Sequence, residues 1–239
     1  MLVIVVLFPK SISIVNHMAQ KAVSANGTSG RTKPHAVVIP FPLQGHVIPA
    51  VHLALRLAAR GFAVTFVNTE SVHQQMAGAL GIGVDRDRYD IFAGAGADVR
   101  YELVSDGFPL GFDRSLNHDQ FMEGVLHVLP AHVEELLRRL VVDPASTCLL
   151  ADTFFVSPAT LARKLGVPCV SFWTQPALSF ALYHHMDLLA KHGHFRCEGS
   201  ITNSQIRNVF LLSSLCPPLF RARTKMMKRT SHDELSPNR

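Results

Sequence analysis

The stretch KPHAVVIPFPLQGHVIPAVHLALRLAARGFAVTFVNTE (residues 33–70) decides the fold. Within it, residues 36–40 form a short apolar, β-branched run bounded by prolines, which predicts a strand buried on both faces. Residues 48–60 carry apolar side chains at helical spacing, and Gly61 supplies a stop signal, so a helix is expected there. Residues 63–67 predict a second strand. This order indicates two parallel strands joined by a helical crossover.

The same alternation returns further along the chain. Residues 148–151 predict a strand, residues 158–165 a helix, and residues 167–172 another strand. Residues 119–140 have apolar side chains at helical spacing, and Pro130 inside them predicts a kink or a break. The expected fold class is therefore α/β, a parallel sheet with helices on both faces.

The remaining segments set the domain organisation. Residues 81–118 are richer in Gly and Asp, and within them only residues 99–104 predict a strand. We expect this stretch to rim the sheet with loops, which often line a binding cleft. Residues 1–33 are expected to form a flexible extension outside the fold. The folded domain is placed at residues 34–197, and residues 198–239 are interpreted as a divergent, basic, disordered tail.

Composition indicates a packed globular protein. The 239 residues are 48% hydrophobic and 17% charged, which argues against wholesale disorder. The net charge of +5 suggests a nucleic-acid or membrane partner at first sight. However, residues 201–239 hold seven basic and two acidic side chains and carry that whole excess. The body is neutral, so no nucleic-acid partner is expected, and a nucleic-acid binder is an alternative that rests on the tail alone.

The cysteines and the N-terminal residues give information on the cellular compartment of the protein. Cys148, Cys169, Cys197 and Cys216 show neither CxxC nor zinc-finger spacing, and the first two sit in apolar runs as buried hydrophobes would. This usage indicates a reducing compartment, and we predict a cytoplasmic location. The apolar run at residues 1–9 is far shorter than the about 20 residues of a membrane span, so no stable membrane insertion is expected.

Several common motifs are missing from the sequence. GxGxxG and GxxxxGK[ST] are absent, which argues against dinucleotide and P-loop enzymes, and there is no GxSxG nucleophile elbow. Residues 85–87, DRD, formally match a metal-binding DxD motif, but no strand precedes them, and we interpret them as a solvated turn. The four histidines within residues 184–194 lack carboxylate or thiolate ligands at metal spacing. No metal site is therefore expected.

His46 is the strongest candidate for chemistry. It follows the first predicted strand directly, in a loop that also contains Gly45, where open α/β sheets place residues that face a ligand. Gly45 allows a close backbone approach, and a histidine titrates near neutral pH. Asp152 closes the later strand at 148–151, and two such strands can lie side by side. A carboxylate beside an imidazole holds its tautomer and stabilises its protonated form, so the pair predicts a general base and its partner.

Four spaced motifs resemble the plant family-1 UDP-glycosyltransferases, enzymes of the GT-B fold with two Rossmann-like domains. The first is the opening stretch at residues 33–70. The others are SDGFP (residues 105–109), LLADTFF (149–155) and FWTQPA (172–177), which stand in the order that the family shows. The resemblance covers about residues 33–197, and it implies that this part is the Rossmann-like N-terminal, acceptor-binding domain of a GT-B enzyme.

The resemblance also implies a reaction. In that family the histidine of the first motif is the general base, which corresponds to His46, and the aspartate of the third motif is its partner, which corresponds to Asp152. The threonine of the fourth motif contacts the donor sugar or its diphosphate, which points to Thr174, while Gly45 lies on the substrate side. The implied reaction is an inverting transfer of a sugar, glucose in our expectation, from a UDP-sugar to a hydroxyl of a small lipophilic acceptor. It uses no metal ion and no cofactor.

The sequence also departs from the family. Family members are roughly twice as long, and nothing here resembles the tryptophan- and histidine-containing signature that binds the UDP-sugar in their second domain, since the single tryptophan is Trp173. Ser157 stands where a bulky aromatic is expected. We therefore expect the chain to be truncated and inactive alone. The alternative is a non-catalytic small-molecule binding or interaction module derived from the same fold.

Overall fold

The computed structural model describes residues 4–6, 20, 33–79 and 90–192. The described residues fall into two units, one within Val3–Thr174 and the other at residues 175–192. The predicted turn at 85–87 and the tail at 198–239 lie outside the described residues, as do His194, Cys197 and Cys216.

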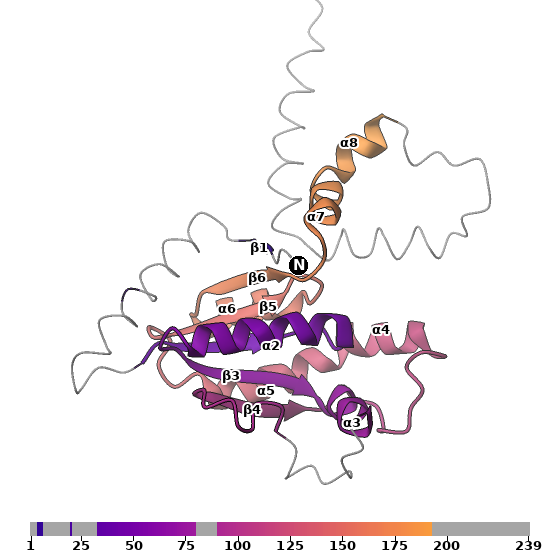
Figure 1. Cartoon of the computed structure of the whole chain (residues 1–239). Coiled ribbons are helices and arrows are strands. Elements are labelled where there is room, and N and C mark those ends of the chain that lie inside the picture. Colours follow the sequence, from indigo (N-terminus) through magenta and orange to yellow (C-terminus); the bar gives the residue numbers. More distant parts are fainter. Residues whose placement is uncertain (1–3, 7–19, 21–32, 80–89, 193–239) are drawn as a thin grey trace, which may run out of the picture. The chain divides into compact units, whose positions relative to one another are not determined.

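The Val3–Thr174 unit is built on a six-stranded sheet with the order β1-β6-β5-β2-β3-β4 (Figure 1). The strands are β1 (Ile4–Val6), β2 (His35–Ile39), β3 (Ala63–Thr69), β4 (Val99–Val104), β5 (Thr147–Asp152) and β6 (Cys169–Trp173). Every pairing from β6 to β4 is parallel, and β1 alone runs antiparallel to its neighbour β6. The α/β fold class with a parallel sheet is confirmed.

Helices cover both faces of this sheet (Figure 1). They are α2 (Gln44–Ala58), α3 (Glu70–Ala79), α4 (His118–His127), α5 (Leu129–Leu140) and α6 (Ser157–Leu165). Side chains of β2 alternate between the faces, as expected for a buried strand. Ala36 and Val38 join the core with α2, whereas Val37 and Ile39 join the core with α4, α5 and α6. The sheet is therefore buried on both sides by apolar layers.

Helix α2 begins earlier than the sequence pattern predicts. The helix was expected at residues 48–60, with Gly45 and His46 in a loop, but it starts at Gln44. The N–H groups of His46 and Val47 bond to the Leu43 carbonyl at 2.9 and 3.0 Å and form an extra first turn. Pro49 lacks an N–H to give to the carbonyl four residues earlier, and the helix tolerates this near its start. Gly45 and His46 therefore sit on a rigid helical turn.

The predicted interruption near Pro130 is confirmed. Helix α4 ends at His127, Val128 joins the two helices, and α5 begins at Leu129 with the proline in its first turn. Proline is favoured there because the first N–H groups of a helix have no intrahelical partner. The break lets α4 and α5 take different directions while both bury apolar side chains on the same face of the sheet.

Strand β1 corrects the prediction that all of residues 1–33 lie outside the fold. Ile4, Val5 and Val6 pair with Trp173, Phe172 and Ser171 across the edge of the sheet. The physical reason is that a run of β-branched residues suits a strand, and β6 would otherwise present an unpaired edge.

The two described cysteines are structural. Cys148 is buried on β5, and Cys169 is partly buried on β6. Burial raises the pKa of each thiol to about 12, so neither thiol ionises near neutral pH. The interpretation as a buried hydrophobe is confirmed for Cys148, whereas Cys169 is partly buried and packs against the core.

The second unit contains two short described helices, α7 (Ala177–His184) and α8 (Met186–Lys191). Leu178 and Leu182 on α7 are exposed. Among the helices of the described ranges, none is both long enough and apolar enough to cross a membrane.

Gly166 offers a simple test of the α6–β6 connection. It ends α6 in the left-handed conformation with φ 69°, and an added Cβ would meet no heavy atom within 4 Å. We expect Gly166→Ala to cost about 1–2 kcal/mol in the free energy of unfolding, from backbone strain alone. Gly78→Ala is the matched control, because Gly78 is exposed on α3 with equal space and should gain up to about 1 kcal/mol. Denaturant unfolding measures both, and equal effects would contradict the assignment of strain to Gly166.

Candidate functional site

Three neighbouring strands bring the candidate site together. Strand β5 lies between β2 and β6 in the sheet, and all three run parallel. His46 lies in the first turn of α2, just after β2, while Asp152 is the last residue of β5 and Thr174 directly follows β6. The carboxyl ends of parallel strands meet at one edge of the sheet. Residues that are far apart in sequence are therefore neighbours here.

The three side chains form one buried hydrogen-bonded group. His46 Nδ1 lies 2.8 Å from Asp152 Oδ2 and 2.9 Å from Thr174 Oγ1. The Thr174 hydroxyl also donates to Asp152 Oδ2 at 3.3 Å. Exposed fractions are 9% for His46, 2% for Asp152 and 5% for Thr174. The predicted pairing of His46 with Asp152 is therefore present in the structure.

This geometry assigns the tautomer of the His46 ring. A carboxylate only accepts hydrogen bonds, so the proton of the ring lies on Nδ1, which donates to Asp152. The lone pair then lies on Nε2, the nitrogen that can accept a proton. The other carboxylate oxygen, Oδ1, accepts the Phe154 backbone N–H at 2.9 Å, which fixes the carboxylate in turn. The arrangement can act as a general base whose protonated form is stabilised by a buried negative charge.

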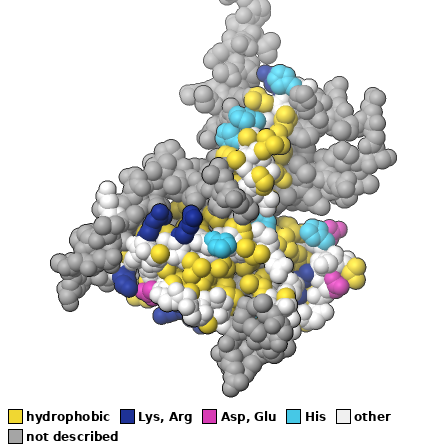
Figure 2. Space-filling view, viewed as in Figure 1, with side chains coloured by type: hydrophobic (Ala, Val, Ile, Leu, Met, Phe, Trp, Pro, Cys, Tyr) yellow, Lys and Arg dark blue, Asp and Glu magenta, His cyan; other side chains and the backbone are white. Residues whose placement is uncertain are grey.

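Aromatic side chains surround the imidazole. Phe41 and Phe154 lie with ring centroids 5.4 and 5.3 Å from that of His46, and Phe154 stacks on Trp173 at 5.3 Å. Leu43 and Ile48, beside the start of α2, are about half exposed. Hydrophobic side chains also gather over the face of the sheet domain that Figure 2 shows. These surroundings suit an apolar ligand with a polar group at the histidine.

The structure also places the other residues that the sequence singled out. Gly45 lies beside His46, and an added Cβ there would meet no heavy atom within 4 Å, so the space next to it is open. The hydroxyl of Thr174 bonds to His46 and Asp152. A role of Thr174 toward a donor substrate stays a prediction. Ser157, where an aromatic was expected, has a buried hydroxyl without a hydrogen-bond partner among the described residues.

A second buried polar cluster, which the sequence did not predict, lies at this end of the sheet. Asp106 follows β4, and both of its oxygens accept hydrogen bonds from Arg114, with Nε–Oδ2 at 2.7 Å and Nη2–Oδ1 at 2.9 Å. Burial alone would raise the pKa of Asp106, but hydrogen bonds from Arg114, Ser71 and the Phe108 backbone outweigh it and hold the pKa below 3.8. The sequence feature that could have indicated this pair is an acidic residue, Asp106, just after the predicted strand at residues 99–104, with Arg114 eight residues later.

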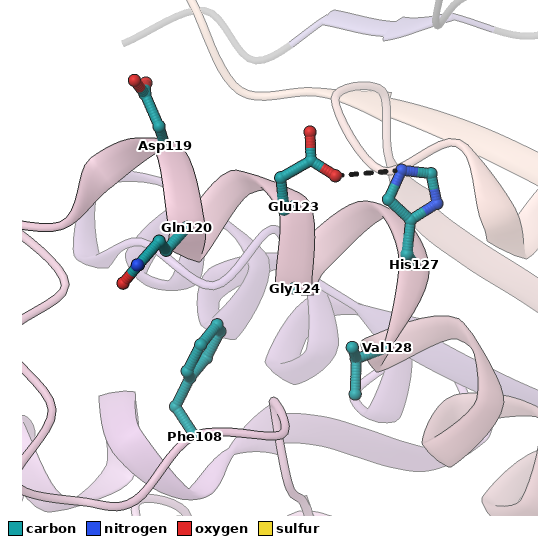
Figure 3. Close-up of a pocket in the computed structure, with 7 residues that line it drawn as sticks. All are labelled: Phe108, Asp119, Gln120, Glu123, Gly124, His127 and Val128. Atoms are coloured by element: carbon teal, nitrogen blue, oxygen red, sulfur yellow. Dashed lines mark ion pairs between the residues drawn. The ribbon is translucent and has the colours of Figure 1, made fainter.

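A shallow hollow of about 570 Å³, largely open to solvent, lies between α4 and the loop that follows β4 (Figure 3). Its apolar part consists of Phe108, Gly124 and Val128. Polar side chains from α4 stand around it, and Glu123 pairs with His127 at 3.2 Å. Within the part of the chain that the structure describes, no group of three or more His, Cys, Asp or Glu side chains is placed to hold a metal ion.

The assigned tautomer can be tested by ¹⁵N NMR of the histidine rings. Under alkaline conditions, where the ring is neutral, we expect His46 to carry its proton on Nδ1 in the wild-type chain. Thr174→Val should keep this tautomer because Asp152 remains, whereas Asp152→Asn should mix or reverse it. A wild-type spectrum with the proton on Nε2 would contradict the assignment.

Known proteins show the same sequence pattern over the sheet domain. The chain is 55% identical over 170 residues to UDP-glycosyltransferase 86A1 of Arabidopsis thaliana and 56% identical over 169 residues to UDP-glycosyltransferase 86A2 of the same plant. Each match covers 69% of this chain and 34% of the relative. A third relative, (R)-mandelonitrile beta-glucosyltransferase of Prunus dulcis, is 35% identical over 159 residues. The chain thus spans about a third of the length of these proteins.

Solved structures share the fold. A UDP-glucose: anthocyanidin 3-O-glucosyltransferase in complex with UDP matches with a TM-score of 0.53 at 24% identity, over 72% of this chain and 36% of that one. A UDP-glucosyltransferase from Polygonum tinctorium capable of glucosylating indoxyl matches with a TM-score of 0.50 at 19% identity, over 73% and 36%. No protein-family model matches the chain.

Proposed function

Because this chain belongs, through its sheet domain, to the plant UDP-glycosyltransferases, we propose that the domain binds a hydroxylated acceptor and supplies the general base for sugar transfer. The acceptor is a small lipophilic molecule, and the sugar, glucose in this proposal, comes from a UDP-sugar. The observation that carries the proposal is the buried contact of 2.8 Å between His46 and Asp152, at the sheet edge where such folds bind ligands.

In the proposed mechanism, His46 Nε2 removes the proton from the acceptor hydroxyl. The acceptor oxygen then forms a bond to the anomeric carbon, and the bond from that carbon to the UDP oxygen breaks. UDP leaves with the electron pair, and the single displacement inverts the anomeric configuration. Asp152 stays ionised and stabilises the imidazolium, which holds the transferred proton on Nε2. We propose that this step uses no metal ion, as the resemblance implies.

Two further residues are assigned to substrates. The open space beside Gly45 supports a close approach of the acceptor to the first turn of α2. Thr174 is proposed to contact the donor sugar or its diphosphate while its hydroxyl keeps Asp152 oriented.

The location and the metabolic role are also part of the proposal. The un-ionised thiols of Cys148 and Cys169 support a cytoplasmic location, and the relatives support a role in plant secondary metabolism.

Binding of a fluorescent acceptor by the 239-residue chain tests the proposal. We choose 7-hydroxycoumarin, with 7-methoxycoumarin as the analogue that cannot donate a proton. A hydrogen bond to His46 Nε2 should make the hydroxy compound bind about 2- to 12-fold more tightly, and His46→Ala should abolish that preference. His52→Ala is the matched control, because His52 is exposed on α2.

The alternative function is a non-catalytic binding module that keeps the acceptor cleft. In that case both coumarins bind with equal affinity and His46→Ala changes neither. This outcome would contradict the assignment of His46 as the base, whereas no binding of either compound would contradict acceptor binding altogether.

A further inference from the structure

The last turns of α2, α5 and α6 lie at the edge of the sheet opposite the candidate site. Each of these helices leads into the next strand through a short connection, at residues 59–62, 141–146 and 166–168. The helix ends therefore lie beside the amino ends of β3, β5 and β6, and the arrows of β3 and β4 in Figure 1 point away from them. The segments before the strands are joined directly, since the His35 N–H donates to the Ser146 carbonyl at 2.8 Å. We call this end of the sheet domain the amino edge.

Basic side chains gather at the amino edge, two of them at or just beyond the end of each helix. All are exposed, and together they form what we call the basic patch: Arg56, Arg60, Arg138, Arg139, Arg163 and Lys164. A basic residue at the C-terminus of a helix interacts favourably with the helix dipole, which explains the sign of the charge at each helix. Because the three helices end at the same edge, their charges also add up on one surface.

Few carboxylates balance this charge. Glu134 pairs with Arg138 at 2.8 Å and with Lys164 at 2.9 Å. In these three helices and the connections after them, the other acidic residues are Glu135 and Asp143, so the patch keeps three positive charges in excess. The remaining four members of the patch form no ion pair with any residue that the structure describes.

The opposite edge of the domain carries negative charge. Glu70 directly follows β3, Asp113 lies in the loop between β4 and α4, and Asp119 lies in the first turn of α4. Arg114, in the same loop, is paired with Asp106. A negatively charged surface would therefore attract the amino edge and repel the edge that holds the candidate site.

An apolar side chain projects from the amino edge. Val142, in the turn between α5 and β5, is 89% exposed. The carboxylate of Asp143 accepts the Ala145 N–H at 3.0 Å, and its carbonyl accepts the Thr147 hydroxyl at 2.8 Å, so the turn has a defined shape. An exposed valine near several arginines suits the boundary between lipid headgroups and acyl chains. The basic patch contains no aromatic side chain on which the bases of a single-stranded nucleic acid could stack.

We propose that the amino edge is a docking surface for an anionic lipid bilayer, where the basic patch binds the headgroups, Val142 lies at the lipid boundary and the candidate site faces away from the bilayer. Guanidinium and ammonium groups bind the phosphate and carboxylate groups of such headgroups through charge-assisted hydrogen bonds. The surface lies at the opposite edge from His46, so the inference does not rest on the proposed function.

Sedimentation of the 239-residue chain with lipid vesicles tests the docking. We expect binding to vesicles of phosphatidylcholine and phosphatidylserine in equal amounts, loss of that binding at high salt, and no binding to pure phosphatidylcholine. One basic residue near such a surface is worth about 5-fold in affinity, so loss of four should weaken binding by about 100-fold or more. The patch variant combines Arg56→Gln, Arg60→Gln, Arg139→Gln and Arg163→Gln.

A second variant with the same loss of charge is the control. It replaces four basic residues of the C-terminal segment with glutamine, namely Arg221, Arg223, Lys225 and Lys228. We expect it to bind the vesicles more tightly than the patch variant by about 10-fold or more. Equal losses in the two variants, a loss confined to the control variant, or no binding of the wild-type chain would overturn the proposal. Binding of duplex DNA but not of vesicles, dependent on the patch arginines, would assign the surface to nucleic acid instead.

Tryptophan fluorescence tests the orientation. Trp173 is the single tryptophan of the chain and is buried at the end of β6, so brominated lipids should leave its emission unchanged. The same lipids should quench the added tryptophan in Val142→Trp. Leu116→Trp is the matched control, because Leu116 is 84% exposed in the loop between β4 and α4 and should stay unquenched. Quenching of Leu116→Trp, or none of Val142→Trp, in vesicle-bound protein would overturn the orientation.

Discussion

Replacing His46 by alanine is expected to lower sugar transfer by about 10²- to 10⁴-fold, the usual contribution of a general base. The test protein is a chimera that joins residues 33–192 of this chain to the remaining C-terminal part of UDP-glycosyltransferase 86A1, which is 55% identical over the matched region. The reason for the large effect is that Nε2 of His46 is the group placed to accept a proton, while Nδ1 is held by Asp152. The rate of UDP release with an acceptor of the parent relative measures it.

Two control variants sharpen this result. Asp152→Asn keeps the shape of the side chain but removes the carboxylate that holds the ring and stabilises its charge, so it should also slow transfer strongly. His52→Ala removes an exposed histidine six residues further along α2 and should leave the rate unchanged. Equal rates for His46→Ala and the wild type, in a chimera with an unaltered thermal transition, would contradict the role of His46.

Breaking the Asp106–Arg114 pair is expected to cost about 3–5 kcal/mol in the free energy of unfolding, because Asp106→Asn leaves the Arg114 charge buried without a counter-charge. Asp98→Asn is the control, since Asp98 and Lys33 form an exposed ion pair and should lose less than about 1 kcal/mol. Denaturant unfolding at neutral pH measures both. Equal losses in the two variants would contradict the account of a buried pair.

The same pair gives stability a pH dependence at acid pH. The folded-state pKa of Asp106 is held below its ordinary value of 3.8. As the pH falls, the carboxyl is therefore protonated at a higher pH in the unfolded chain than in the folded chain. The stabilisation is therefore fully present above about pH 4 and is lost as the pH falls through the folded-state pKa. Asp106→Asn should flatten this acid limb, and an unchanged slope in the variant would contradict the assignment.

The strands and helices of the sheet domain could be predicted from the sequence because their signals are local. Short apolar runs predicted β2, β3 and β5, helical spacing of apolar residues predicted the helices, and Pro130 marked the break between α4 and α5. The first turn of α2 was missed because Leu43 offers no side-chain cap and the turn depends on its backbone carbonyl. Strand β1 was missed because its partner, β6, is distant in the sequence and only the folded sheet shows the open edge.

Part of the candidate site could be predicted from the order of the strands, and part could not. His46 lies in the first turn of the helix that follows β2, and Asp152 ends β5, so their contact could be expected from the parallel pairing of β2 with β5. The hydrogen bonds of the Thr174 hydroxyl, and those between Asp106 and Arg114, depend on the directions of side chains in loops. The spacing of apolar residues along the sequence does not indicate these directions. The need for glycine at position 124 likewise becomes visible only in the folded chain, because a Cβ there would collide with the Phe108 ring.

The most direct test of the central claim is sugar transfer by the chimera with unchanged residues 33–192. We expect the chimera to release UDP from the donor and to form the glycoside of an acceptor that the parent relative uses, with inversion at the anomeric carbon. A folded chimera that binds the acceptor but forms no glycoside, while the parent relative does, would contradict the claim that this domain supplies the acceptor site and the base.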